Sequence, residues 1–250
     1  MSFFVLMAQA IAVQAVPTTI YPQGPKTFNE QFSTWNAGPD ATDQVTPLHR
    51  WRTIDKSGSA SMFNHATLVS DAAFSLQPGP YLAITATKGA DGQWRSGYAS
   101  TKFSFKQLRG YFEFDANLPV CTKGAWPGLW MLPTEASFLW PRYGEIDLAE
   151  TVGDGRIYQT IHSIVLGTPG SFASSAPCTR GWHTYGVLWR KSTISFYVDR
   201  KLTNTVATPA DFTSPMYLIM DLAMGGAWAG TPTVTRESML VRRVSAWGEQ

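Results

Sequence analysis

The chain has 250 residues and a net charge of +2 at pH 7, and its Lys and Arg residues are scattered without a basic run. This charge pattern argues against a nucleic-acid-binding protein, and no apolar stretch is long enough to span a bilayer. Apolar residues make up 44% and charged residues 15%, which indicates one compact globular protein with a core large enough to fold without a metal or a disulfide. We expect a monomer with no nucleic-acid partner and no membrane span.

The N-terminal residues predict an exported protein. Residues 3–16 form a short apolar stretch, and Val13-Gln14-Ala15 is an acceptable small-residue cleavage site for a secretory signal. The basic residue that usually opens such a signal is missing, since no Lys or Arg precedes Lys26. We predict a signal peptide over residues 1–15, an N-terminal extension over 16–27 and a single domain over 28–250, in a secreted or periplasmic protein.

The two cysteines, Cys121 and Cys178, both lie in loop-like sequence beside prolines. An exported protein tends to pair its cysteines, and a disulfide that closes a loop of this length could contribute roughly 4 kcal/mol to stability. Two separate thiols are the alternative, and the sequence leaves both open.

Short segments with alternating side chains recur between turn signals, which is typical of an all-β protein. The clearest of these segments are residues 80–88, 110–118, 183–189 and 193–198. Residues 216–220 are apolar on both faces, as expected for a central strand, and Asp199-Arg200-Lys201 predicts a hairpin turn. No window keeps a helical periodicity beyond a turn or two. The pattern predicts two packed antiparallel sheets.

The segment Glu145-Ile146-Asp147-Leu148-Ala149-Glu150 gathers three carboxylates. Glu145 and Asp147 are two apart and share a strand face, whereas Glu150 would point to the opposite face. A β-bulge around Leu148-Ala149 would bring all three carboxylates to one face. The two glutamates then lie about 13 Å apart at the backbone. Side chains that lean together can close this to the roughly 5 Å of a retaining glycosidase.

Three carboxylates on one face repel one another, so one of them should hold its proton near neutral pH. Such a proton supplies the acid that glycoside hydrolysis requires. A solvated acidic strand is one alternative interpretation of the same pattern. A calcium cluster is another, because hard oxygen ligands also gather carboxylates.

A strong turn, Gly153-Asp154-Gly155, follows the acidic strand. Residues 156–163 should therefore return as its antiparallel neighbour. Counting across the turn and allowing for the bulge pairs the two strands as Tyr158 with Glu150, Thr160 with Asp147, and His162 with Glu145. By parity these side chains share the carboxylate face, which makes His162 a candidate cleft residue.

These residues resemble glycoside hydrolase family 16 in its bulged, laminarinase-type form. The active-site motif is matched by residues 144–150, and further matches follow in order from about Phe28 to Trp247. They include Ser96-Gly97 with Thr101-Lys102, Gly110-Tyr111-Phe112-Glu113, Trp126-Pro127-Gly128-Leu129-Trp130, Trp140-Pro141, Trp182-His183-Thr184-Tyr185, Phe196-Tyr197-Val198-Asp199 and Gly225-Gly226-Ala227-Trp228-Ala229-Gly230.

The resemblance implies a β-jelly-roll sandwich of two antiparallel sheets with a concave substrate cleft. It implies that Glu145 is the nucleophile, Glu150 the acid/base and Asp147 a helper that tunes the pair. It also implies five sugar-contacting positions, which are Trp126, Trp130, Trp140, His162 and Trp228. Aromatic rings suit sugars because one face of a pyranose ring is apolar while its hydroxyls need polar partners.

Three residues depart from the family pattern. Asp221 stands where Asn is frequent before the Gly-Gly turn, which adds charge near the cleft. Arg200 follows Asp199 where Gly is usual. Arg242 stands where many members place an Asp that helps to hold a calcium ion. We therefore expect that no cofactor is required and that structural calcium is doubtful.

These observations predict a retaining endo-glycoside hydrolase that cleaves a β-linked polysaccharide, a β-1,3- or β-1,3(4)-glucan first of all. The sequence leaves open another β-linked substrate, such as a galactan or a bacterial exopolysaccharide, and transglycosylation instead of hydrolysis. A non-catalytic glucan-binding protein is the alternative from a different class. It is disfavoured because such relatives lack the catalytic glutamates that this chain retains.

Overall fold

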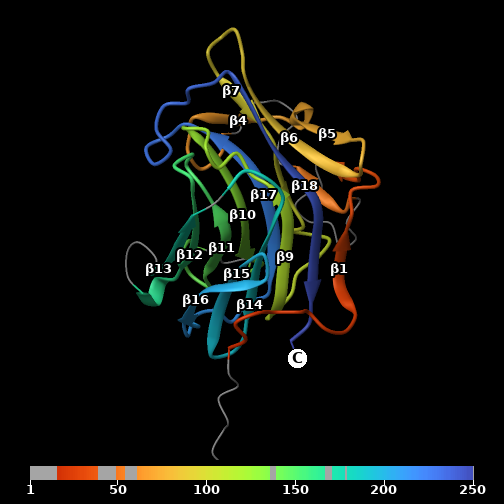
Figure 1. Cartoon of the computed structure of the whole chain (residues 1–250), viewed down its shortest axis with the longest axis vertical. Coiled ribbons are helices and arrows are strands. Elements are labelled where there is room, and N and C mark those ends of the chain that lie inside the picture. Colours follow the sequence, from red (N-terminus) through yellow and green to blue (C-terminus); the bar gives the residue numbers. More distant parts are fainter. Residues whose placement is uncertain are drawn as a thin grey trace, which may run out of the picture.

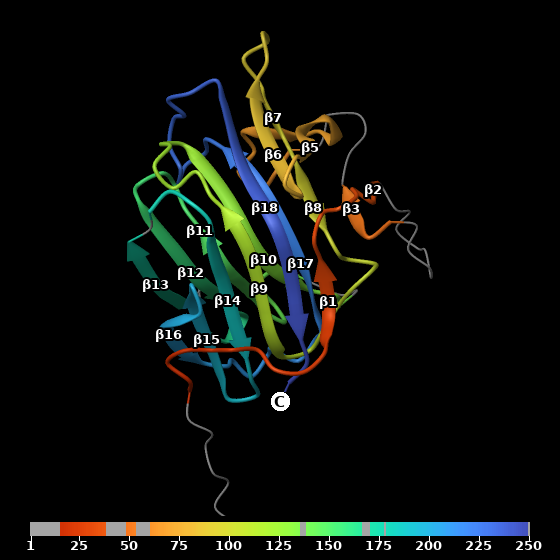
Figure 2. The same cartoon turned by 45° about the vertical axis from the view of Figure 1, so that its right-hand side comes forward.

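The computed structural model describes residues 16–38, 49–53, 61–135, 139–166, 171–177 and 179–249. Within them, two sheets pack face to face around one core, and the carboxylate strand belongs to the second sheet (Figures 1 and 2).

The first sheet has ten strands, in the order β16-β15-β14-β9-β18-β6-β7-β4, with β1 added beside β18 and β5 beside β6. Its strands are β1 (Lys26–Glu30), β4 (Thr67–Val69), β5 (Phe74–Gln77), β6 (Tyr81–Lys88), β7 (Trp94–Ser96), β9 (Gly110–Asn117), β14 (His183–Trp189), β15 (Thr193–Val198), β16 (Lys201–Ala207) and β18 (Arg236–Trp247). We call it the outer sheet.

The second sheet has eight strands, in the order β13-β12-β11-β10-β17-β8-β3-β2. They are β2 (Ala37–Gly38), β3 (Trp51–Thr53), β8 (Tyr98–Ser100), β10 (Ala125–Pro133), β11 (Glu145–Glu150), β12 (Arg156–His162), β13 (Ser171–Pro177) and β17 (Met216–Met224). We call it the cleft sheet. Two short 3-10 helices, η1 (Asp71–Ala73) and η2 (Ile164–Leu166), lie in the connections.

The strands expected from alternation are confirmed, since residues 80–88, 110–118, 183–189 and 193–198 correspond to β6, β9, β14 and β15. Two pairings correct the expectation of wholly antiparallel sheets, because β2 pairs with β3 and β4 with β7 in parallel. Parallel neighbours need a crossover connection of about a dozen residues or more. Residues 39–50 and 70–93 supply connections of that length between these strands.

The core between the sheets is built from the inward faces of their central strands. All nine residues of β17 are buried, as expected for a central strand, and β17 lies between β10 and β8. Phe112 and Phe114 of the outer sheet belong to the same cluster of buried residues as Leu129 and Met131 of the cleft sheet. Because these residues alternate with outward-facing ones, each strand directs every second side chain away from the core.

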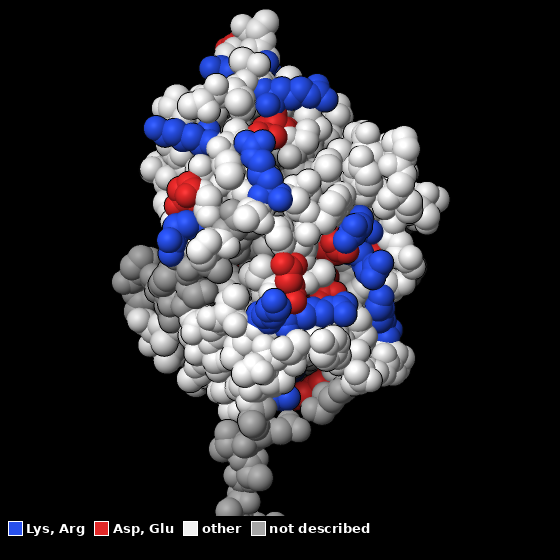
Figure 3. All heavy atoms as spheres, viewed as in Figure 1, with Lys and Arg blue, Asp and Glu red and all other residues white. Residues whose placement is uncertain are grey.

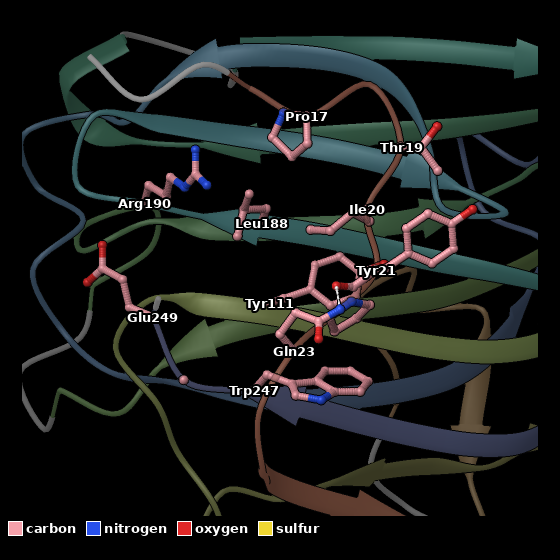
Figure 4. Close-up of a pocket in the computed structure, with 12 residues that line it drawn as sticks. Pro17, Thr19, Ile20, Tyr21, Gln23, Tyr111, Leu188, Arg190, Trp247 and Glu249 are labelled. Carbon is pink, nitrogen blue, oxygen red and sulfur yellow. Dashed lines mark hydrogen bonds between the residues drawn. The ribbon is translucent and has the colours of Figure 1, made fainter. Parts of the chain in front are cut away.

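The segment over residues 16–25, which we call the strap, runs across the outward face of the outer sheet (Figure 2). Ile20 donates its backbone N–H to the carbonyl of Arg200, and the carbonyl of Pro17 accepts the hydroxyl of Tyr197 at 3.0 Å. Figure 4 shows the cavity of about 380 Å³ between the strap and the sheet, with Tyr111 and Trp247 in its lining. The predicted extension is therefore folded against the domain.

Two expectations fall partly or wholly outside the described residues. The predicted signal peptide over 1–15 does so, and so does Cys178, whereas Cys121 is an exposed, free cysteine. Among the described residues, no helix is long and apolar enough to cross a membrane.

Candidate active site

The carboxylate strand β11 has the bulge that the sequence predicts. Its register with β12 pairs Glu145 with His162, Asp147 with Thr160, and Glu150 with Tyr158, and it shifts between Asp147 and Glu150. The register with β10 shifts at the same place. Two residues, Leu148 and Ala149, thus occupy the place of one, and both are buried. The bulge places all three carboxylates on the cleft face, as predicted.

A buried glutamine supports this bulge from the core side. Gln159 lies on β12 between two cleft-facing residues, so its side chain points into the core, where it is fully buried. Its Nε2 donates to the carbonyl oxygen of Leu148 at 3.2 Å, and its Oε1 accepts the hydroxyl of Thr203 on β16 at 2.5 Å. A bulge disrupts the regular ladder locally, and this amide partners one of its backbone oxygens. Gln159 is not among the residues that the sequence predicts for the site.

The cleft face of the sheet is ordered in rows of directly paired residues. The row that holds Glu150 runs from Tyr98 on β8 through Asp221 and Gly128 to Glu150 and Tyr158. Gly128 has no side chain, so the carboxylates on either side of it are separated only by its backbone. A Cβ there would lie 3.0 Å from Oδ1 of Asp221. The glycine therefore makes room for a fourth carboxylate near the predicted three.

Three tryptophans hold carboxylates by the N–H edge of their indole rings. Trp126 donates to Oε1 of Glu150 at 2.7 Å, and Trp140 donates to Oε2 of Glu145 at 2.9 Å.

The third, Trp130, donates to Oδ1 of Asp221 at 2.7 Å. The family resemblance predicts only sugar contacts for these three tryptophans. In the structure, the indole N–H of each also orients a carboxylate.

His162 lies beside the acids, as the count across the turn predicts. Its Nε2 is 3.7 Å from Oε1 of Glu145 and 3.1 Å from Oδ2 of Asp147. Its ring packs against Trp140, with the two centroids 5.4 Å apart. Tyr158 pairs with Glu150 in register, but its hydroxyl donates to Asp154 in the turn at 2.6 Å.

Burial and mutual repulsion disfavour the ionised form of the cleft carboxylates and so raise their pKa values. Burial raises the pKa of Glu145 well above its ordinary value, and the charge of Asp147 raises it further. Burial likewise raises the pKa of Asp147, with Glu150 as the next cause, and burial raises the pKa of Glu150 against the hydrogen bond from Trp126. The expectation that one carboxyl keeps a proton near neutral pH agrees with these directions.

Asp221 is the most enclosed of the four acids. It is 0% exposed, and its Oδ2 has no hydrogen-bond partner among the residues that the structure describes. Burial raises its pKa well above the ordinary value, and the charges of Glu150 and Glu145 raise it further, against the hydrogen bond from Trp130.

Glu145, Asp147 and Glu150 line a cavity of about 590 Å³ with aromatic walls. Its lining comprises Phe63, Trp126, Gly128, Trp130, Leu132, Trp140, Glu145, Asp147, Glu150, Thr160, His162 and Trp228. Every predicted site residue is therefore brought into one place. Phe63 was not predicted; it meets Trp126 edge to face with ring centroids 4.6 Å apart. A single phenylalanine in a loop gives no sequence signal for this position.

Three of these side chains could also hold a metal ion. Glu145, Asp147 and His162 offer ligand atoms within 4.8 Å of one another, and this is the one such group found among the described residues. Aromatic walls beside buried acids fit a sugar and acid–base chemistry, whereas calcium sites consist of oxygen ligands.

The family model for glycosyl hydrolases family 16 matches residues 62–245. This match spans most of the chain and contains the whole carboxylate strand. The chain belongs to glycosyl hydrolases family 16.

Among characterised relatives, an endo-1,3-1,4-beta-glycanase, EglC, of Rhizobium meliloti is 34% identical over an alignment of 230 residues that covers 83% of this chain and 48% of that protein. A beta-glucanase of Rhodothermus marinus is 35% identical over an alignment of 150 residues that covers 52% of each protein. The chain spans about half the length of these relatives. A solved structure of a non-specific endo-beta-1,3(4)-glucanase from the same family superposes with a TM-score of 0.75 at 26% identity, covering 92% of this chain and 98% of that one.

Proposed function

We propose that the protein is a retaining endo-glycoside hydrolase that cleaves a β-linked glucan, with β-1,3- or mixed β-1,3(4)-linkages first. The observation that carries this proposal is the bulged strand, because it aims Glu145, Asp147 and Glu150 into one aromatic cleft. Retaining enzymes need two carboxylates on one face, one to attack the sugar and one to protonate the leaving oxygen.

The environments of the two glutamates support distinct roles. Glu145 faces two groups that stabilise its anion, the indole N–H of Trp140 and the imidazole of His162. We assign Glu145 as the nucleophile for this reason. Glu150 receives one indole N–H and has no imidazole or other cation within 4.0 Å among the described residues, so we assign it the proton. Burial raises the pKa of both glutamates, so the neighbouring groups separate their roles.

The reaction then runs in two steps. Glu150 transfers its proton to the glycosidic oxygen while the carboxylate of Glu145 bonds to the anomeric carbon, so that the glycosidic bond breaks and a glycosyl-enzyme forms. Glu150, now a carboxylate, takes a proton from water. The resulting hydroxide attacks the anomeric carbon and releases Glu145, which restores both groups. Asp147 acts by its charge on Glu145.

The sugar-contacting positions are part of the same proposal. We assign Trp126, Trp130, Trp140, His162 and Trp228 to the substrate, because all five line the cavity. Trp228 keeps 43% of its surface exposed beside Trp126 and Tyr158, which leaves a ring face available to a pyranose.

A digestion panel tests this proposal. Purified protein is incubated with laminarin, mixed-linkage glucan, agarose and carrageenan, and the products are sized over time. We expect a ladder of short oligosaccharides from laminarin or mixed-linkage glucan and none from the Glu145→Gln variant, which should remain folded. Cleavage of agarose or carrageenan alone would favour a galactan. Products longer than the substrate would favour transglycosylation, and full activity of Glu145→Gln would refute the mechanism.

We further propose that no structural calcium is required, contrary to the habit of the family. The guanidinium of Arg242 lies 2.7 Å from Oδ2 of Asp115 on the outer sheet, so a cation of the protein already neutralises the acid at this place. A second cation would be repelled. We expect EDTA to leave the melting temperature unchanged within about 1 °C. A fall of many degrees that calcium reverses would contradict this.

We propose export through residues 1–15, which the apolar leader and the small-residue site before Val16 support. We also propose that the protein is a monomer. Expression of the full chain in a bacterial host, followed by N-terminal sequencing of the exported protein, tests the cleavage site. Gel filtration with light scattering gives the mass. Retention of Met1 in the cytoplasm, or a mass of two chains, would contradict these proposals.

A further inference from the structure

Two cations for which the described residues supply no counter-ion lie toward one end of the cleft sheet, on the face that carries the acids. Arg52 is the middle residue of β3, and its neighbours Trp51 and Thr53 are buried. It pairs with Ser100 on β8, which pairs with Ile219 on β17, and that residue pairs with Trp130. Directly paired residues share a face, so Arg52 lies on the cleft face. Four strand spacings separate β3 from β11, roughly 19 Å.

Arg52 is half-buried. Its Nε is buried with no hydrogen-bond partner among the described residues, and its guanidinium lies 5.4 Å from the ring centroid of Phe103. Among the described residues, no carboxylate lies within 4.0 Å of it. Other arginines differ, since Arg50, Arg95 and Arg200 each contact an acid at 2.9 Å or less. A buried charged donor without a partner requires an explanation, because its desolvation is costly.

Lys102 brings a second positive charge to the same place. Its Nζ lies 5.9 Å from the ring centroids of both Phe103 and Tyr217. Burial lowers the pKa of Lys102, and the charge of Arg52 lowers it further. Two like charges beside the same ring repel each other, so their pairing is unfavourable unless an anion joins them.

Two tyrosines, Tyr98 and Tyr217, lie between this pair and the acids on the same face of the sheet. Tyr98 pairs with Asp221, and Tyr217 pairs with Leu132 at the cavity. Burial raises the pKa of Tyr217 to about 12, Arg52 acts against this shift, and Glu145 adds to it. The charges of both Arg52 and Glu145 therefore act on Tyr217. A polysaccharide bound at the acids and extended across β17 and β8 would reach Arg52 several sugar units from the scissile bond.

We propose that Arg52 and Lys102 form an anion subsite that binds a carboxylate or similar negatively charged substituent on the polysaccharide. The proposal deepens the function proposed above and rests on it. The terminal nitrogens of a guanidinium present directed N–H donors to an oxyanion, and the ammonium adds an undirected charge. The preferred substrate would then be an acidic β-glucan, carrying its charge away from the cleavage point.

The first experiment compares one glucan in two forms, laminarin and the same laminarin carboxymethylated to a low degree. The quantity measured is the ratio of kcat/KM for the charged form to that for the neutral form. We expect the ratio to fall about 10-fold in Arg52→Gln and in Lys102→Gln, because each loses a charge-assisted contact. It should also fall in wild type at high salt. Arg52→Lys should retain most of it, and Arg236→Gln, an exposed cation on β18, should retain all of it.

The second experiment removes turnover from the comparison. In the Glu145→Gln background, the Kd of carboxymethylated and neutral laminarin oligosaccharides is measured by calorimetry, with and without Arg52→Gln. We expect the charged ligand to bind tighter and to lose about 10-fold on removal of the guanidinium. Equal Kd values for the two ligands, or an unchanged ratio in Arg52→Gln, would refute the anion subsite. If wild type cleaves neither glucan, the hydrolase proposal fails, while the binding result still decides the subsite.

Discussion

Buried carboxylates lie on the outward faces of both sheets, but they are partnered in opposite ways. On the outer sheet, Glu113 accepts two hydrogen bonds from Arg200 at 2.9 and 3.0 Å, and Asp115 contacts Arg242 at 2.7 Å. Figure 3 shows this face, where red acidic side chains lie next to blue basic ones. In the cleft, Glu150 and Asp221 have no cation within 4.0 Å among the described residues.

We interpret the outer acids as serving stability and the cleft acids as serving the proposed reaction. A guanidinium beside a carboxylate neutralises its charge and donates hydrogen bonds to it. Indole N–H groups orient a carboxylate without cancelling its charge, so the cleft acids keep raised pKa values. Two residues that depart from the family pattern, Arg200 and Arg242, are the cations that neutralise the outer acids.

The largest expected effect comes from removing the proton carrier of the cleft. We predict that Glu150→Ala lowers kcat by about 10²- to 10⁴-fold, because protonation of the leaving oxygen is lost. Azide should restore part of the activity by attacking the glycosyl-enzyme in place of water. The matched change on the other face, Glu113→Ala, should leave kcat at 25 °C close to wild type. A similar loss in both variants would break the comparison.

Asp147→Asn tests whether charge repulsion tunes the cleft. The charge of Asp147 raises the pKa of Glu145, so its removal should let Glu145 ionise at lower pH. We predict a loss of roughly 10- to 100-fold in kcat/KM and an acid limb moved to lower pH. A pH–activity profile of unchanged shape would contradict the tuning role and leave only a positioning role.

Arg200→Ala should lower the stability of the fold and leave kcat unchanged. The buried carboxylate of Glu113 would keep only the hydroxyl of Tyr111, which donates to it at 3.0 Å. We predict that the free energy of unfolding falls by about 2 kcal/mol and that the melting temperature falls by roughly 4–8 °C. Differential scanning calorimetry measures the loss, and Glu113→Gln in the same chain should recover part of it. An unchanged melting temperature would show that the pair contributes nothing.

The smallest expected effect is that of Asp221→Asn, which should raise the melting temperature instead of lowering it. Asp221 has a raised pKa in the folded state, so it stabilises the protein below its unfolded pKa and this contribution is lost as pH rises through the folded pKa. Asp221→Asn keeps an oxygen for Trp130 and removes the charge. We predict a gain of roughly 3 °C at pH 7 that shrinks toward pH 4. Asp115→Asn, the matched change in a paired acid, should lower the melting temperature.

Much of this arrangement follows from local rules in the sequence. The pairing of Glu145 with His162 is predictable because strand parity and turn length fix it, given one inserted residue. The parallel pair β2 and β3 is not predictable, since strands of two and three residues show no alternation.

The orientation of the tryptophan rings is also beyond the sequence. The sequence shows that Trp126 and Trp130 are present. It does not show which edge of each ring faces an acid, because the rotamer depends on tertiary packing. Gln159 left a usable signal, namely an amide at a core-facing position opposite a predicted bulge. The sequence predicts that Asp221 adds charge near the cleft. Its position opposite Gly128 could not be predicted, because it depends on the register of β17 with β10.

The hydrogen bonds of Gln159 have a consequence for anyone who would transplant this catalytic strand into another scaffold. The spacing between Glu145 and Glu150 depends on a bulge whose carbonyl at Leu148 is held by an amide from the neighbouring strand, and that amide is held by Thr203 of the opposite sheet. Copying the residues that face the sugar would leave these two anchors behind. The smallest portable unit of the active site therefore spans both sheets of the sandwich.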